Sequence, residues 1–162
     1  MMNFNKDIAV RPAAFDDAAA LANLLRDADV EEIRAATGFD PLAGLLDSLE
    51  ASTITQYATF KNQPLAMFGV RVIEAGGEII GMPWMLGSDL IAQIPISLMR
   101  YSRHWLAELE QNCTWLRNYV LSSHQDSISY LQHLGFSFDA PVTLGPEQKT
   151  FLPFYKNLKE KD

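Results

Sequence analysis

The stretch Leu65–Ile73 constrains the fold more than any other part of the chain. Its two alternating sets of side chains are both almost entirely apolar, and they are Ala66, Phe68, Val70 and Val72 on one side and Leu65, Met67 and Ile73 on the other. Successive side chains of a strand point to opposite faces of a sheet, so such a strand has to be covered on both faces. We therefore expect it in the middle of a sheet with a further layer on each side.

Turn residues on both sides of this strand predict two tight connections. Lys61–Pro64 precedes it and Ala75–Gly77 follows it, and both are rich in residues that favour turns. The flanking stretches Thr53–Phe60 and Glu78–Leu86 are β-prone. The middle of the chain is therefore predicted to be a meander of three antiparallel strands.

A short strand and three helices are expected before the meander. Ile8–Pro12 is a β-prone run that ends in proline. Apolar residues at steps of three and four predict a first helix, and they are Ala18, Leu21, Leu25 and Ala28. A second helix over Val30–Thr37 should end at Gly38, and a third is expected over Pro41–Ala51.

A long helix is expected after the meander. Pro95 suits its first turn, and its apolar stripe consists of Ile94, Leu98, Tyr101, Trp105 and Leu109. Thr114–Leu121 then has the composition of a strand.

The C-terminal part should hold one short helix and two strands. Ser123 and Asp126 have the spacing of a helix cap, and Gly135 should end that helix. Phe136–Val142 and Thr150–Tyr155 are expected to be the last two strands.

Composition and charge narrow the classes of function. A chain of 162 residues with 48% hydrophobic residues suits a single domain over residues 1–162. The net charge is −7 and the thirteen Lys and Arg residues are mostly scattered, which argues against nucleic acid and against a membrane surface as partners. No eighteen-residue apolar run and no secretory signal are present, so a cytoplasmic protein is expected. Small molecules or other proteins remain as partners.

The single cysteine, Cys113, excludes an internal disulfide and cannot by itself form a zinc site. We interpret it as a packing or surface residue and expect no metal site.

Two motifs resemble the GNAT superfamily of acetyl-CoA-dependent N-acetyltransferases. Ser129–Phe136 is similar to the "YxxLGF" ending that follows the fifth strand in these enzymes, and Ile8–Pro12 followed by Asp16 and Asp17 is similar to their "IRPAxxxD" opening. The expected order of elements is also that of the superfamily. The resemblance implies an α+β fold with a central mixed, mostly antiparallel sheet of about seven strands, helices on both faces, and acetyl-CoA as cofactor.

Residues 80–138 resemble more closely the GNAT-like internal virion proteins of short-tailed phages. The similar segments are Trp84–Asp89, the helix through Arg100 and Trp105, and Trp115–Val120 leading into Ser127–Leu131. This resemblance implies a role in the phage particle, with other virion or head-tail proteins as partners. It also leaves open that the protein forms an oligomer.

The superfamily's pyrophosphate loop corresponds to Gly87–Pro95, and the candidate cofactor-binding residues are Met85, Leu86, Gly87 and Ser88. The family's loop holds the pyrophosphate with backbone N–H groups of a glycine-rich turn. This chain has one glycine there, followed by Asp89, whose charge would repel a diphosphate. Binding of the cofactor in the family's usual manner is therefore doubtful.

Tyr130 and His124 are the candidate catalytic residues. The family's acid, a tyrosine five residues before the Phe of "LGF", corresponds to Leu131. Tyr130 is its neighbour, about 100° around the helix, and is expected to point elsewhere unless the helix is shifted by one residue. His124 stands where the family has asparagine and could donate a hydrogen bond or act as a base. Glu78 and His104 are the other candidates for the base.

Two functions remain open at this point. The leading one is a GNAT-fold protein associated with the virion or its assembly, with weak or absent acetyltransferase activity. The alternative is an active acetyl-CoA-dependent N-acetyltransferase with a divergent pyrophosphate loop, with Tyr130 or His124 as acid or base.

Overall fold

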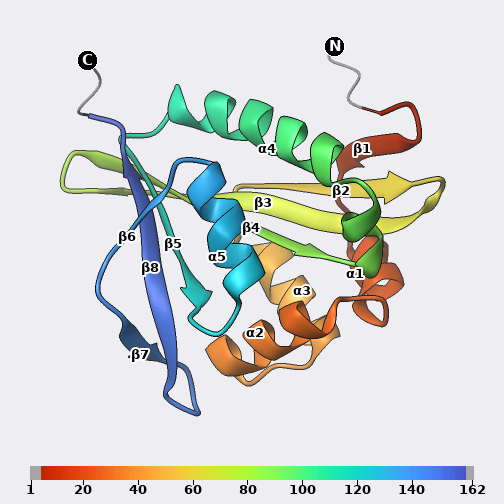
Figure 1. The fold of residues 1–162 in the computed structure, drawn as a ribbon, viewed down its shortest axis with the longest axis horizontal. Coiled ribbons are helices and arrows are strands. Elements are labelled where there is room, and N and C mark those ends of the chain that lie inside the picture. Colours follow the sequence, from red (N-terminus) through yellow and green to blue (C-terminus); the bar gives the residue numbers. More distant parts are fainter. Residues whose placement is uncertain (1–4, 160–162) are drawn as a thin grey trace.

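A computed structural model describes residues 5–159, which form an eight-stranded sheet with helices on both faces (Figure 1). The strand order is β1-β2-β3-β4-β5-β8-β6, and β7 pairs with β8 beside this path. Within the described part of the chain, only β4 and β5 pair in parallel. The predicted α+β class with a mixed, mostly antiparallel sheet is confirmed, with eight strands instead of about seven.

The first four strands form an antiparallel unit with β3 near its centre. They are β1 (Ile8–Pro12), β2 (Ile54–Phe60), β3 (Gln63–Ala75) and β4 (Glu78–Gly87). The two residues that join β2 to β3, Lys61 and Asn62, have φ of 51° and 64°, as the turns that suit twisted hairpins require. The predicted meander is confirmed.

Strand β3 is covered on both faces, as its sequence predicts. Six consecutive residues, 65–70, are buried. Met67 packs among the three N-terminal helices, whereas its neighbour Phe68 packs with side chains of α4 on the other face.

Three helices cover one face of the sheet. They are α1 (Phe15–Ala22), α2 (Asp27–Thr37) and α3 (Pro41–Ala51). Leu21, Leu45 and Met67 are fully buried where this layer meets the sheet. The Asp40 carboxylate accepts a hydrogen bond from the Ala43 N–H at 2.8 Å and caps α3.

The prediction that the first helix reaches Leu25 and Ala28 is wrong, because α1 ends at Ala22. Leu25 forms an antiparallel bridge with Ser88, and the Arg26 N–H donates to the Gly87 carbonyl at 2.9 Å. Hydrogen bonds to the end of β4 thus replace a further helical turn.

Helix α4 (Pro95–Glu110) covers part of the other face and is preceded by the short 3₁₀ helix η1 (Asp89–Gln93). The long helix is confirmed, and its apolar stripe faces the sheet. Phe68 contacts two aromatic side chains of this stripe edge to face, with ring centres 5.5 Å from Tyr101 and 5.4 Å from Trp105.

Strand β5 (Trp115–Leu121) leads into α5 (Gln125–His133). The predicted cap by Ser123 is wrong. The N-cap residue is His124, no side chain caps the helix, and Asp126 lies in its first turn. Because the helix begins one residue late, Ser123 is outside the cap position.

The predicted strand over Phe136–Val142 is wrong in its extent. Two short strands occupy this region, β6 (Ser137–Phe138) and β7 (Val142–Leu144), and both pair with β8 (Lys149–Asn157). Pro141 lies between them and has no N–H to continue a ladder. Strand β8 is longer than predicted and is inserted between β5 and β6.

Cys113 is buried in the core between α4 and β5, which confirms its interpretation as a packing residue. Within residues 5–159, no helix is long and apolar enough to cross a membrane. The same residues contain no group of three His, Cys, Asp or Glu side chains that could share a metal ion.

Candidate functional site

The candidate site lies where β4 and β5 separate. Their parallel pairing consists of Ile80 with Trp115 and Gly81 with Leu116. Beyond this point β4 continues to Gly87 without pairing to β5, and the Asn118 side-chain amide spans the gap by donating to the Pro83 carbonyl at 2.9 Å. The separation opens the sheet between its two halves.

A cavity of about 800 Å³ passes through this opening. Residues of β4 and β5 line its middle, α4 and α5 line it on one side, and α2 and α3 line it on the other. Its volume is within the range of small-molecule sites.

Two of the four candidate cofactor-binding residues, Met85 and Leu86, line the cavity. Gly87 and Ser88 lie at the end of β4, where both are buried. The Gly87 N–H donates to the Asp29 carboxylate at 2.8 Å, and the Ser88 N–H donates to the Leu65 carbonyl at 2.9 Å. The Gly87 and Ser88 amides are therefore already bonded within the protein and are not free to hold a pyrophosphate.

The glycine at position 87 is explained by packing. A Cβ atom there would lie 1.9 Å from Cδ1 of Ile91, which belongs to η1. The Ser88 hydroxyl donates to the Pro64 carbonyl at 2.8 Å, and the Ser88 carbonyl accepts the Ile91 N–H at 3.1 Å. The loop is thus folded onto β3 and not around an open space.

Tyr130 joins the two helices on the α4 side of the cavity. Its hydroxyl is hydrogen-bonded to the Ser102 hydroxyl and lies 3.4 Å from the Leu98 carbonyl, both on α4. Burial raises the pKa of Tyr130 to about 12. Tyr130 and Leu131 both line the cavity.

His124 lies outside the residues that line the cavity and is held by α2. Its ring nitrogens lie 3.5 Å from Glu31 and 3.6 Å from Glu32, and its side chain is only 10% exposed. The Glu32 carboxylate, followed by that of Glu31, raises the pKa of His124 against the opposing effect of burial. The structure does not bring His124 and Tyr130 to the same part of the cavity.

The two other candidate bases also lie away from the cavity. The Glu78 carboxylate accepts hydrogen bonds from Lys159 at 2.8 Å and from Thr114 at 2.7 Å, and these partners lower its pKa. His104 lies 3.3 Å from Glu108 on the same helix. Glu78 thus connects β4 to the residues that follow β8, and His104 belongs to the outer side of α4.

Sequence reasoning missed a partly buried ion pair beside the end of β4. The Asp29 side chain is 5% exposed and accepts hydrogen bonds from Arg26 at 2.9 and 3.0 Å as well as from Gly87. Burial raises the pKa of Asp29, and Arg26 partly opposes this effect. Both side chains line the cavity. Only their spacing of three residues is visible in the sequence, and that spacing is common on solvated helices.

No family model matches the chain, and no curated protein matches it. Solved structures do. An aminoglycoside N(6')-acetyltransferase from Legionella pneumophila has a TM-score of 0.71 and 9% identity, with 99% of this chain and 96% of that chain covered. A GNAT-family acetyltransferase from Streptococcus pneumoniae has a TM-score of 0.64 and 16% identity, with 92% and 98% covered. The chain has the GNAT fold.

A third similar structure, from Salmonella typhimurium, was solved with acetyl-CoA as its cofactor. It has a TM-score of 0.64 and 15% identity, and the comparison covers 96% of each chain. At such identities the similarity concerns the GNAT fold and not the chemistry.

Proposed function

We propose that this chain is a GNAT-fold protein of the phage internal-virion type, which acts in particle assembly or is packed with the particle. It is made in the cytoplasm of the host, its partners are other virion or head-tail proteins, and its acetyltransferase activity is weak or absent. The phage role rests on the resemblance of residues 80–138, and the loss of activity rests on the geometry of the site.

The observation that carries the loss of activity is the state of the Gly87 and Ser88 amides. A pyrophosphate needs several N–H groups that point toward it, and both of these donate within the protein instead. Freeing the Gly87 N–H would leave the buried Asp29 carboxylate with one hydrogen bond fewer, at a cost of roughly 1–3 kcal/mol. Cofactor binding at this loop therefore has to overcome an existing structure.

Tyr130 is also poorly suited to act as the acid. A thiol has an ordinary pKa of about 8.5, so a tyrosine with a pKa of about 12 would donate its proton to the thiolate uphill by about 3.5 pKa units. Its hydroxyl is in addition committed to Ser102 on α4. Transfer of an acetyl group by this route should be slow.

A second function, an active N-acetyltransferase that uses acetyl-CoA, is favoured by the cavity itself. It opens between the separated strands, and Met85, Leu86 and Tyr130 line it. In this function the cofactor would pass along Met85 and Leu86, and Tyr130 would protonate the thiolate that leaves. His124, which lies outside the cavity lining, is not placed to act on the amine.

Thermal unfolding with and without acetyl-CoA separates the two functions. A ligand at one hundred times its Kd stabilises a protein by about 2.7 kcal/mol, which is roughly 5–10 °C in Tm for a chain of this size. We expect a shift below about 1 °C at a concentration of about 1 mM, which would be one hundred times a Kd of about 10 µM. A shift of the full size together with turnover of an amine would overturn the proposal.

The virion role has its own test, which is mass spectrometry of purified particles of the phage that encodes the chain. The chain should be present in a fixed ratio to the head or tail proteins. Its absence from particles and from assembly intermediates would contradict that role.

A further inference from the structure

The sheet face that carries α1, α2 and α3 continues beyond these helices. They pack around Met67 on β3 and Trp84 on β4, and both strands run on from there to the hairpin that joins them. In Figure 1 the three helices lie away from this hairpin. Alternate residues of a strand and their register partners share a face. The residues that continue this face, which we call the open face, are Arg71, Ile73, Ile80, Met82, Trp115, Arg117, Pro153 and Tyr155.

The apolar members of the open face are only half-buried. Within residues 5–159, none of them belongs to a cluster of buried core residues or packs against one. Trp115 and Tyr155 contact each other instead, with ring centres 6.1 Å apart. Trp, Tyr and Met are enriched in the cores of protein–protein interfaces. The composition of the open face is therefore that of a contact surface.

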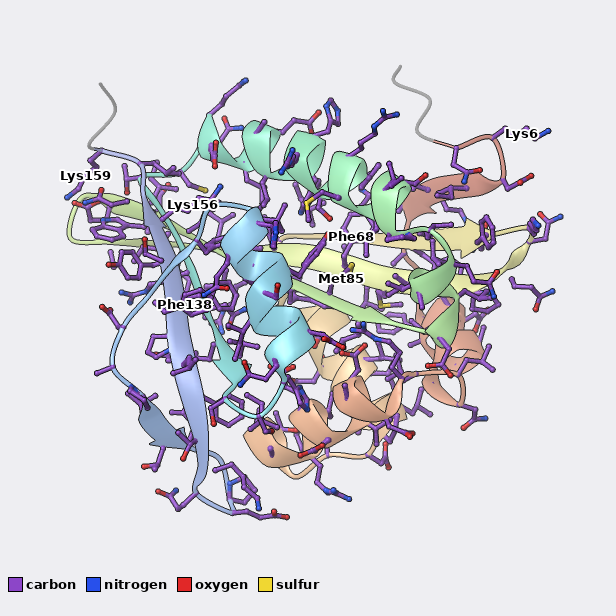
Figure 2. The ribbon with its side chains drawn as sticks, viewed as in Figure 1. Lys6, Phe68, Met85, Phe138, Lys156 and Lys159 are labelled. Atoms are coloured by element: carbon purple, nitrogen blue, oxygen red, sulfur yellow. The ribbon has the colours of Figure 1, made fainter. Side chains whose placement is uncertain are left out.

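The two charged members of the open face, Arg71 and Arg117, are exposed. Among the described residues neither arginine has an ion-pair partner. At the border of the face, Lys159 is neutralised by Glu78 at 2.8 Å, and Figure 2 shows Lys159 beside the β3–β4 hairpin. The arginines lie on β3 and β5, the two neighbours of β4, so they flank Met82. The open face is thus positive on a chain whose net charge is −7.

We propose that the open face binds a protein partner that presents carboxylates on both sides of an apolar side chain. The apolar side chain covers Met82 and Trp115, and the carboxylates accept hydrogen bonds from Arg71 and Arg117. A second copy bound through the same face would instead bring arginines against arginines. The inference rests on the proposed function only for the existence of a protein partner, and it does not depend on acetyl-CoA.

The test measures the binding of three rhodamine-labelled peptides to the full chain by fluorescence anisotropy. Each peptide has a central Leu-Trp-Leu, flanked on both sides by two Glu, two Gln or two Lys residues. Each exposed arginine–carboxylate pair contributes up to about fivefold in affinity, so the Glu peptide should bind about tenfold more tightly than the Gln peptide at low salt. The preference should fall below about threefold in about 0.5 M NaCl.

The net charge of −7 repels the Glu peptide at long range, so a preference for it can arise only from a local positive surface. A Gln or Lys peptide that binds as tightly as the Glu peptide overturns the proposal.

A matched pair of double variants locates the carboxylate contacts. Arg71→Gln combined with Arg117→Gln should lower the affinity for the Glu peptide about tenfold and leave that for the Gln peptide unchanged. The control combines Arg100→Gln with Arg103→Gln, on two exposed residues of α4 beyond the other face of the sheet, and should change neither affinity. Equal effects of the two double variants contradict the assignment.

A second pair of variants locates the apolar contact. Trp115→Ala should weaken the Glu and Gln peptides alike, whereas Ile96→Ala, on a residue of α4 that is 71% exposed, should weaken neither. Unchanged binding by Trp115→Ala contradicts the assignment, and the peptide series on the unaltered protein decides it if this variant fails to fold.

Sedimentation velocity tests whether a second copy occupies the face. Up to about 200 µM, the wild type should show no dimer that Trp115→Ala dissociates. Such a dimer would make the second copy the occupant and overturn the proposal. The virion role fails separately, because absence of the chain from particles would leave the peptide preference as it is.

Discussion

Replacing Tyr130 with phenylalanine tests whether its hydroxyl connects two helices or performs chemistry. The hydroxyl is partly buried, bonded to Ser102 and close to the Leu98 carbonyl. Removing it takes away one hydrogen bond and leaves the Ser102 hydroxyl without this partner. Such a loss typically costs about 1 kcal/mol, or up to about 2 where the remaining group stays desolvated.

For a chain of 162 residues, about 1 kcal/mol corresponds to a decrease in Tm of about 2–4 °C. We expect this decrease for Tyr130→Phe and a similar one for Ser102→Ala. The double variant should lose less than the sum, with a coupling energy of about 0.5–1.5 kcal/mol in a double-mutant cycle. Urea unfolding of the four proteins measures this coupling directly.

The same variant should leave any residual acetyl transfer unchanged. The reasoning would be refuted if Tyr130→Phe kept the wild-type stability, showed no coupling to Ser102→Ala and abolished transfer to an amine. That result would make Tyr130 the acid of an active enzyme.

Two further predictions concern stability. The pKa of His124 is raised in the folded protein by Glu32 and Glu31, so its contribution is fully present below the ordinary histidine pKa of about 6.5 and is lost as the pH rises through the folded value. The free energy of unfolding of the wild type should therefore fall relative to that of His124→Gln between about pH 6 and 8. Parallel profiles of the two proteins would contradict the pairing. Gly145→Ala should lower the free energy of unfolding in urea more than twice as much as Gly76→Ala. Both glycines have positive φ, +80° for Gly145 and +57° for Gly76. A Cβ added at Gly145 would lie 1.8 Å from the Ala35 carbonyl oxygen, whereas one added at Gly76 would meet nothing within 4 Å. Gly76→Ala should cost only the roughly 1–2 kcal/mol of the left-handed conformation, and equal losses would show that the contact with Ala35 is relieved without cost.

The central part of the fold could be predicted because its signals are local. The two-sided apolar pattern of β3 depends only on alternation within one strand, and the turns on either side depend on a few residues each. The long helix α4 was likewise predictable from a stripe that begins at its N-cap residue, Ile94, and continues within its own sixteen residues.

Where the prediction of the fold was wrong, distant hydrogen bonds decided the outcome. Leu25 continues the helical pattern of the sequence before it, yet it pairs with Ser88, which lies 63 residues later in the chain. The strand predicted over residues 136–142 is divided where Pro141 interrupts the pairing with β8. The pairing of Leu25 with Ser88 is not visible in the segment around Leu25, whereas Pro141 is visible in the sequence of its own segment.

The candidate site shows the same limit. Sequence reasoning placed Tyr130 on a short helix and found that the loop after β4 lacks glycines, and the structure agrees with both. It could not predict that Ser102 would hold the Tyr130 hydroxyl or that Asp29 would accept the Gly87 N–H. These partners come from other helices, and only the folded arrangement brings them together.

The position of β8 has a consequence for how the chain is made. Strand β8 pairs with β5 on one side and with β6 and β7 on the other, although it is the last of them to be synthesised. Until residues 149–157 have left the ribosome, one edge of β5 is unpaired. The core also lacks the side chains of Phe151 and Phe154, which are buried there in the folded protein. A nascent or truncated chain that lacks β8 would therefore expose an aggregation-prone edge, so the second half of the sheet can close only after β8 has been synthesised.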